Sequence, residues 1–93
     1  MSEEDLHHLL LYTYVPDVGE RRGPHRPGHL AHIQAHKDTG KLVMAGALGT
    51  PPTGGAFVWR GATTDEIETF VAGDPYRQAE LITSWRIEPW TLV

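Results

Sequence analysis

Residues 26–48 read RPGHLAHIQAHKDTGKLVMAGAL, and this stretch decides the fold. Pro27 suits the first turn of a helix, where its missing amide hydrogen is not needed. Leu30 and Ile33 supply a short apolar stripe on the same helical face. Gly40 stands where a left-handed cap would end the helix, and the strand pattern KLVMAGAL follows it directly. The stretch therefore predicts a helix followed at once by a strand.

The chain before this stretch supplies a first strand. Residues 7–15 read HHLLLYTYV, a run of aliphatic and aromatic residues that is typical of a mostly buried strand. Residues 16–28 are rich in proline and glycine and predict a loop. The helix is predicted over residues 26–39 and the next strand over residues 41–48. A strand reached through a crossover helix is expected to lie parallel to the first strand in the same sheet.

The second half of the chain repeats this order. The segment GTPPTGG, residues 49–55, has turn chemistry, and residues 56–61 return to β-type residues, so we expect a β-hairpin. Thr63 followed three residues later by Glu66 is a capping-box pattern, and Gly73 ends the helix that it opens.

A short helical turn and a last strand complete the order. Asp74 suits a helix cap and Pro75 the first helical position, which predicts a turn of helix to about Ile82. The C-terminal residues SWRIEPWTLV then predict a strand. The order β-α-β-β-α-β is the split βαβ, ferredoxin-like arrangement of the α+β class, in which a four-stranded antiparallel sheet carries two helices on one face.

The face of the sheet opposite the helices is expected to be apolar and to bind something that shields it from water. Alternate residues of the first strand share a face, and neither of its two faces is polar. Such a sheet either binds a ligand or pairs with a second copy of the chain, and we expect both. The residues expected on this open face are Tyr12, Tyr14, Val43 or Met44, and Trp59 or Val58.

Length and composition narrow the class of protein. Ninety-three residues support one hydrophobic core, so we expect one domain over residues 1–93, with residues 1–6 as a flexible acidic leader. The chain has no cysteine and no run of about 18 apolar residues, which excludes disulfides and a membrane-spanning helix. It opens Met-Ser-Glu-Glu-Asp without the positive charge of an export signal, and we expect a cytoplasmic protein.

The charge balance argues against nucleic acid as a partner. Twelve acidic against eight basic side chains give a net charge of −4, which repels a phosphate backbone. The segment TGGAFVWR is similar to the third strand of RNA-recognition motifs, but Gly55 and Arg60 stand where base-stacking aromatic residues are needed.

Four histidines form a row on the first helix. His25, His29, His32 and His36 are spaced by four, three and four residues, so they project from a narrow sector of it. Such a row could bind a metal, but zinc sites normally take further ligands from another element. The alternative, which we favour, is that His32 and His36 lie on a solvated flank of the helix. We therefore predict no metal and no cofactor.

His29 differs from the others because it lies in the first turns of the helix. There the positive end of the helix dipole disfavours the imidazolium and keeps a neutral base available. A carboxylate usually orients such a base, and Asp74 is a candidate, although it could serve only as a helix cap. Arg21, Arg22 and Arg26 form a basic cluster nearby in sequence, either an anion site or a solvated loop.

Several motifs resemble the YciI-like family. They are RPGHLAHI at residues 26–33, KLVMAGAL, AGDPYRQAEL at residues 72–81, and IEPW near the C-terminus. The most specific are RxxHL, here Arg26, His29 and Leu30, and DPY, here Asp74, Pro75 and Tyr76. The resemblance covers residues 8–92. This chain departs from the family in a short, proline-rich loop between the second and third strands and in its acidic N-terminal extension, and both put the shape of the pocket in doubt.

The resemblance has implications for fold and site. It implies a ferredoxin-like α+β fold and dimers of the α/β-barrel type, whose sheets pack together. It also implies a His-Asp pair in a pocket, carried here by His29 and Asp74, with Arg26 and Tyr76 as substrate-binding residues. A family relative in aromatic catabolism removes hydrogen chloride from a chlorinated hydroxyquinol, which offers elimination as a reaction class.

Two functions remain open from the sequence. The first is a small enzyme that uses the His-Asp pair for acid-base chemistry, of the lyase (elimination) or isomerisation type, on a small aromatic or anionic molecule. The second is a non-catalytic, small-molecule-binding or regulatory dimeric module. Both predict a homodimer, or a higher oligomer built from it, and a small-molecule ligand.

Overall fold

The computed structural model of the chain describes residues 6–93. The leader predicted over residues 1–6 lies outside the described residues except for Leu6, whose carbonyl accepts a hydrogen bond from the Gly61 amide. The elements in chain order are β1 (His7–Tyr14), α1 (Val18–Arg21), the 3-10 turn η2 (Gly23–His25), α2 (Arg26–Asp38), β2 (Leu42–Leu48), β3 (Gly54–Arg60), α3 (Thr64–Gly73), α4 (Pro75–Gln78) and β4 (Ile82–Trp90).

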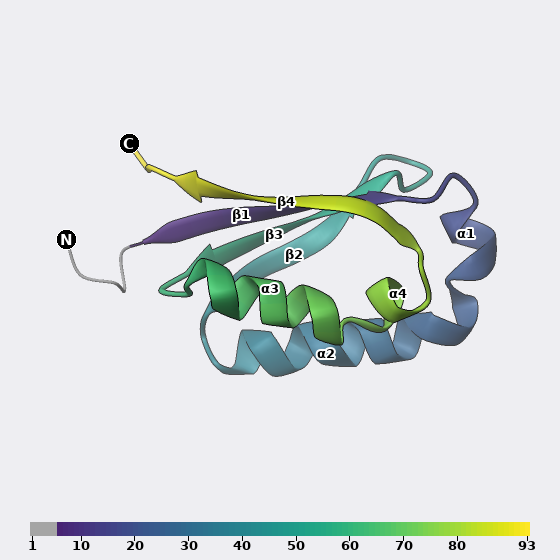
Figure 1. Ribbon diagram of the computed structural model, residues 1–93, viewed down its shortest axis with the longest axis horizontal. Helices are drawn as coiled ribbons and strands as arrows, with labels where there is room; N and C mark the ends of the chain where they lie inside the picture. The colour runs from purple at the N-terminus through teal and green to yellow at the C-terminus, as the bar shows by residue number, and fades with distance from the viewer. Residues whose placement is uncertain (1–5) are drawn as a thin grey trace.

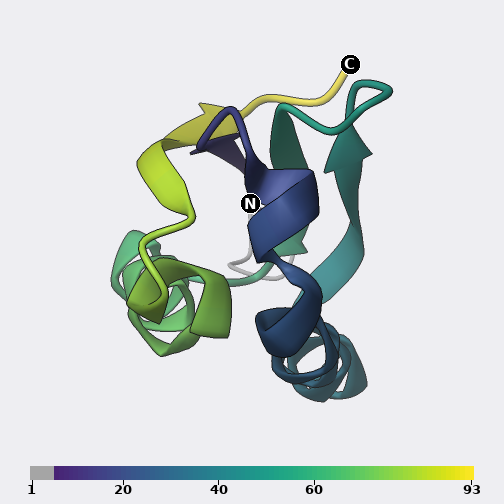
Figure 2. The same ribbon diagram turned by 90° about the vertical axis from the view of Figure 1, so that its right-hand side faces the viewer.

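The four strands form one antiparallel sheet in the order β2-β3-β1-β4. Figures 1 and 2 show α2, α3 and α4 together on one side of this sheet, with the other side open. The predicted α+β class and the order β-α-β-β-α-β are therefore confirmed. The prediction of a loop over residues 16–28 was wrong in part, because α1 and η2 form there before α2 begins.

Local capping fixes the ends of the helices. The Thr63 hydroxyl accepts a hydrogen bond from the Glu66 amide at the start of α3, as predicted. Gly40 has a φ of 83° in the turn after α2, a conformation that glycine adopts without strain. Asp74 caps α4 through the Tyr76 amide. The last strand begins at Ile82, earlier than predicted.

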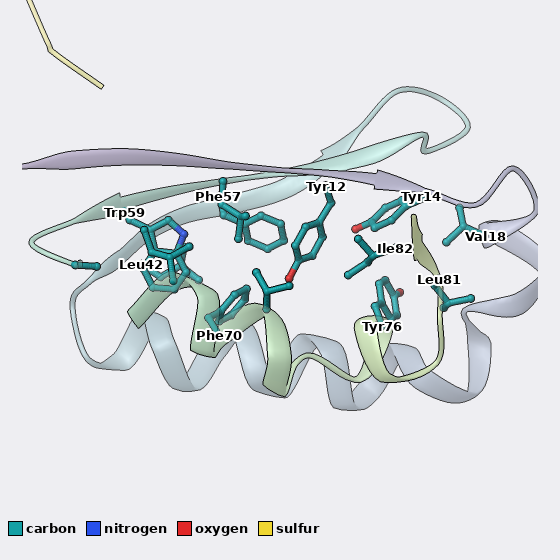
Figure 3. Packing of buried hydrophobic residues seen from close by; sticks show 14 residues of the cluster. Tyr12, Tyr14, Val18, Leu42, Phe57, Trp59, Phe70, Tyr76, Leu81 and Ile82 are labelled. Carbon is teal, nitrogen blue, oxygen red and sulfur yellow. The ribbon is translucent and has the colours of Figure 1, made fainter. Parts of the chain in front are cut away.

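Three large rings of the sheet lie on the side of the helices. Tyr12, Tyr14 and Trp59 are 3%, 8% and 2% exposed, and Figure 3 shows their side chains in the layer between sheet and helices. The prediction that these three residues could lie on the open face was therefore wrong. The reason is that α2 contributes few aliphatic side chains, so large rings from the strands fill the layer between sheet and helices.

The open face is nevertheless apolar. Leu9, Leu11 and Val58 lie half-buried on it, and the pairing of Leu9 with Val58 and of Met44 with Val58 places their side chains together. Met44 and Leu48 on β2 are largely exposed. Of the predicted residues, Val58 and Met44 thus belong to this face. No helix within residues 6–93 has the length and apolar character needed to cross a membrane.

Candidate active site

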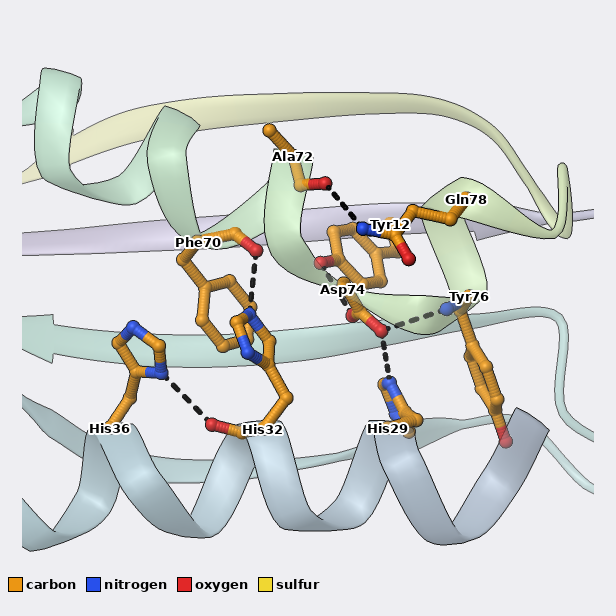
Figure 4. A network of polar contacts seen from close by, with 9 residues as sticks. All are labelled: Tyr12, His29, His32, His36, Phe70, Ala72, Asp74, Tyr76 and Gln78. Carbon is orange, nitrogen blue, oxygen red and sulfur yellow. Dashed lines mark hydrogen bonds and ion pairs between the residues drawn. The ribbon is translucent and has the colours of Figure 1, made fainter.

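The site is built around a fully buried carboxylate. Asp74 lies between α3 and α4 and is 0% exposed. One carboxylate oxygen, Oδ1, accepts hydrogen bonds from the Tyr76 amide at 2.9 Å and from His29 Nδ1 at 2.8 Å. The other oxygen, Oδ2, accepts a hydrogen bond from the Tyr12 hydroxyl at 2.9 Å (Figure 4). Three donors from three elements therefore hold this one side chain in place.

His29 is the fourth residue of α2, and its position depends on how closely α2 approaches α4. Gly28 permits this approach, because a Cβ there would lie only 3.1 Å from the Pro75 side chain. The imidazole stacks on the Tyr76 ring, with ring centroids 3.7 Å apart and the planes 3° from parallel. The stacking and the bond to Asp74 together fix the orientation of the imidazole.

The hydrogen bond to Asp74 also selects the tautomer of His29. A carboxylate accepts hydrogen bonds, so Nδ1 carries the proton and Nε2 keeps a lone pair. Nε2 makes no hydrogen bond within residues 6–93. This is the arrangement that a histidine base requires.

His29 lines a cavity of about 320 Å³ between α2 and β2, which we call the α2–β2 cavity. Its cationic lining residues are Arg22, Arg26 and Lys37. No carboxylate lines it, and its remaining wall is mainly small and apolar or aromatic. A larger hollow of about 490 Å³ lies elsewhere, against the open face of the sheet, and contains no histidine or carboxylate. The acid-base groups thus belong to the α2–β2 cavity.

The tyrosines of the site stay protonated at neutral pH. Burial raises the pKa of Tyr12 far above its ordinary value, and the charge of Asp74 raises it further. Burial likewise raises the pKa of Tyr14 and of Tyr76. The charge of Arg22 opposes this shift at both residues. All three hydroxyls are therefore hydrogen-bond donors.

Two further histidines of the row, His32 and His36, are packed rather than solvated. His32 stacks on Phe70 with ring centroids 4.5 Å apart, and its Nε2 donates to the Phe70 carbonyl at 2.8 Å. His36 Nδ1 donates to the His32 carbonyl at 2.9 Å, and its ring meets Trp59 edge-on. The prediction of a solvated flank for these two histidines was wrong, because flat imidazoles pack on aromatic rings of the core while their nitrogens reach carbonyls.

The buried face of α2 also differs in part from the predicted one. Leu30 is 45% exposed, although it was expected in the buried stripe, whereas His29 is buried. Within residues 6–93, no three histidine or acidic side chains come together in a way that could hold a metal ion. The absence of a metal in the living protein stays a prediction.

Three of the four site residues predicted from the sequence are in mutual contact. His29, Asp74 and Tyr76 meet at the junction of α2 and α4, and Arg26 lines the same cavity. Arg21, in contrast, pairs with Asp17 at 3.6 Å.

Sequence reasoning missed Tyr12 and Tyr14 as members of the site. The available signal was the alternation of the first strand, which places both hydroxyls on one face.

Comparison with known proteins identifies the family. The sequence model of the YCII-related domain matches residues 6–91. The chain belongs to the YCII-related domain family. The predicted resemblance to YciI-like proteins is thereby confirmed. No curated protein matches the chain.

A solved structure shares the fold of this YCII-related domain. It is 5-chloro-2-hydroxyhydroquinone dehydrochlorinase from Burkholderia phenoliruptrix AC1100, in complex with 2,5-dihydroxybenzoquinone. The TM-score is 0.77 at 22% sequence identity, over 91% of this chain and 93% of that one. At this level of identity the likeness concerns the fold.

Proposed function

We propose that this protein is a small enzyme that uses the His29–Asp74 pair for acid-base chemistry of the elimination or isomerisation type. Its substrate is a small aromatic or anionic molecule. The observation that carries this proposal is the buried carboxylate with three donors, which leaves the lone pair of His29 Nε2 at the α2–β2 cavity.

In this mechanism His29 Nε2 removes a proton from the substrate, and Asp74 stabilises the imidazolium that forms. His29 then returns the proton to another atom in an isomerisation, or loses it to solvent after a leaving group departs. Arg26 binds an anionic group of the substrate, and the Tyr76 ring holds the imidazole plane. The shared fold with a dehydrochlorinase bound to a hydroxylated quinone supports an aromatic substrate.

The test is proton exchange at carbon. The protein is incubated in D2O with 2,5-dihydroxybenzoquinone and with simple 2-oxo acids, and deuterium incorporation is followed by NMR. We expect faster exchange with the wild-type protein than with His29→Asn. His25→Asn is the matched control, because His25 lies outside the cavity lining. Ligand binding without any catalysed exchange would replace this proposal by the alternative of a binding module.

A second copy of the chain is the partner that we propose for the open face of the sheet. Exposed Met44 and Leu48, beside half-buried Leu9, Leu11 and Val58, give this face an apolar surface that pairing would cover. Sedimentation at micromolar concentration should give the mass of a dimer for the wild-type protein. Val58→Asp should give a folded monomer, whereas a monomeric wild-type protein would contradict the pairing.

A further inference from the structure

One hydroxyl in the wall of the α2–β2 cavity has no partner within the described residues. Tyr14 is 8% exposed, and its hydroxyl makes no hydrogen bond within residues 6–93. The hydroxyl lies over Gly55, where an added Cβ would come within 3.0 Å of it, and beside Phe57 and Gly46. Phe57 and Gly46 line the α2–β2 cavity. Tyr14 lines the same cavity, so its hydroxyl is open to donate a hydrogen bond to a molecule that binds there.

The guanidinium of Arg22 lines the same cavity as the Tyr14 hydroxyl. Arg22 lies at the junction of α1 and η2 and lines the same cavity. The charge of Arg22 lowers the pKa of Tyr14 and of Tyr76, but burial has the larger effect and raises the pKa of each. Tyr14 thus remains a protonated donor beside a permanent positive charge. A neutral donor and a cation in the lining of one cavity favour a negatively charged oxygen.

We propose that the Tyr14 hydroxyl and the Arg22 guanidinium bind the anionic oxygen that forms on the substrate when His29 takes its proton. This inference rests on the proposed function and names the substrate class, a carbonyl compound with an acidic carbon-bound hydrogen, or its enol or phenol form. In the carbonyl form the C–H bond breaks, the proton goes to His29 Nε2, and the electron pair moves through the adjacent carbon onto the carbonyl oxygen. In the enol or phenol form the O–H bond breaks, the proton goes to His29 Nε2, and the electron pair stays on the oxygen. No oxidant or second reactant is required.

The rest of the cavity fits such an anion. The charged groups that face it are Arg22, Arg26 and Lys37, all positive, while Asp74 lies behind the His29 ring and is engaged by its own three donors. Small residues of β2 (Ala45, Gly46 and Ala47) line the opposite wall and leave room for a planar molecule.

The test uses 4-nitrophenol, whose ionisation is visible in its absorbance. The absorbance of 4-nitrophenol bound to the protein is recorded as a function of pH. The charged groups that act on the bound phenol are Arg22, Arg26 and Lys37. In the wild-type protein, bound 4-nitrophenol should ionise at a pH about one unit lower than in buffer, because the site favours the phenolate. Tyr14→Phe and Arg22→Gln should each remove a large part of this shift. Arg77→Gln, which deletes the same charge from a side chain stacked on Trp85, should keep it.

The outcomes separate this inference from the proposed function. In His29→Asn the bound phenol should still ionise at a lower pH than in buffer, although proton exchange is lost. The reason is that Tyr14 and Arg22 bind the anionic oxygen without the help of the base. Three results would overturn the inference. The phenol fails to bind at millimolar concentration, or the bound phenol ionises at the same pH as in buffer. The third is that the bound phenol still ionises at the lower pH in both Tyr14→Phe and Arg22→Gln. Melting curves confirm that each variant is folded, and Arg22→Gln, on a partly exposed side chain, tests the idea even if Tyr14→Phe unfolds.

Discussion

The two halves of helix α2 use the same residue type for different purposes. In the N-terminal half, His29 meets the carboxylate of Asp74 through Nδ1 and reaches a cavity. In the C-terminal half, His32 and His36 donate to backbone carbonyls and pack on the rings of Phe70 and Trp59. All three rings point into the layer below the sheet, and Figure 4 shows them side by side along the helix.

The difference between the two halves lies in the partner of each ring. A carboxylate stabilises the imidazolium and so prepares a ring to accept a proton on its far nitrogen. A backbone carbonyl accepts the same hydrogen bond without a full negative charge, and the ring then serves as a polar piece of the core. The type of acceptor, rather than the histidine itself, separates the candidate base from its neighbours.

The largest expected effect follows from breaking the pair in the N-terminal half. His29→Asn and Asp74→Asn should each lower the rate of proton exchange by about 10² to 10⁴. The double variant should lose little more, because residues that act as a unit are not additive. Exchange rates of the four proteins measure this. Additive losses would separate the two residues and contradict the unit.

The C-terminal half should give the opposite result. His32→Ala removes the stacking on Phe70 and leaves the Phe70 carbonyl without its donor, so the free energy of unfolding should fall by about 2 kcal/mol. Proton exchange in the folded protein should change less than twofold. Urea unfolding and exchange assays on the same sample provide the comparison. A large loss of exchange without a loss of stability would place His32 in the chemistry.

Tyr12→Phe tests how much the hydrogen bond from Tyr12 contributes to holding the carboxylate of Asp74. The variant removes one of the three donors to Asp74 and keeps the ring that fills the core. Stability should fall by about 2 kcal/mol, since one hydrogen bond to a buried charged group is lost. Exchange should slow only a few-fold, because the bond between His29 and Asp74 remains. Loss of all activity would mean that Tyr12 itself moves a proton.

The smallest effect belongs to the surface pair at the far end of α2. Lys41 Nζ donates to Glu66 at 2.6 Å, and this bond lowers the pKa of Glu66 below its ordinary 4.5. Both side chains are 44% exposed, so Glu66→Gln should cost only a few tenths of a kcal/mol at neutral pH. A lowered pKa means that the contribution is present above pH 4.5 and disappears as the pH falls through the lowered value. Unfolding at pH 7 and pH 3 measures the change.

The element order and the helix ends could be predicted because they depend on local chemistry. Thr63 with Glu66, Gly40 after α2, and Asp74 before Pro75 each act within a few residues. The pairing of His29 with Asp74 joins positions 45 residues apart. Local pattern offered Asp74 only as a candidate that could equally be a helix cap, and the resemblance to a family implied the pair.

The orientation of side chains could not be predicted in the same way. Alternation in β1 separates two faces of similar polarity, and nothing local indicates which one the helices cover, so Tyr12 and Tyr14 were placed on the wrong face. The acceptor of His32 is a carbonyl 38 residues away, and a backbone carbonyl has no sequence signature. Partners of that kind become visible only in three dimensions.

The central claim is that Asp74 holds His29 with the proton on Nδ1 and a lone pair on Nε2, and NMR of ¹⁵N-labelled histidines tests it most directly. At a pH where the rings are neutral, His29 should appear as the Nδ1–H tautomer, and Asp74→Asn should alter its signals. His32 should appear as the Nε2–H tautomer, because that nitrogen donates to Phe70. A His29 ring that carries its proton on Nε2, or is unaffected by Asp74→Asn, would contradict the account.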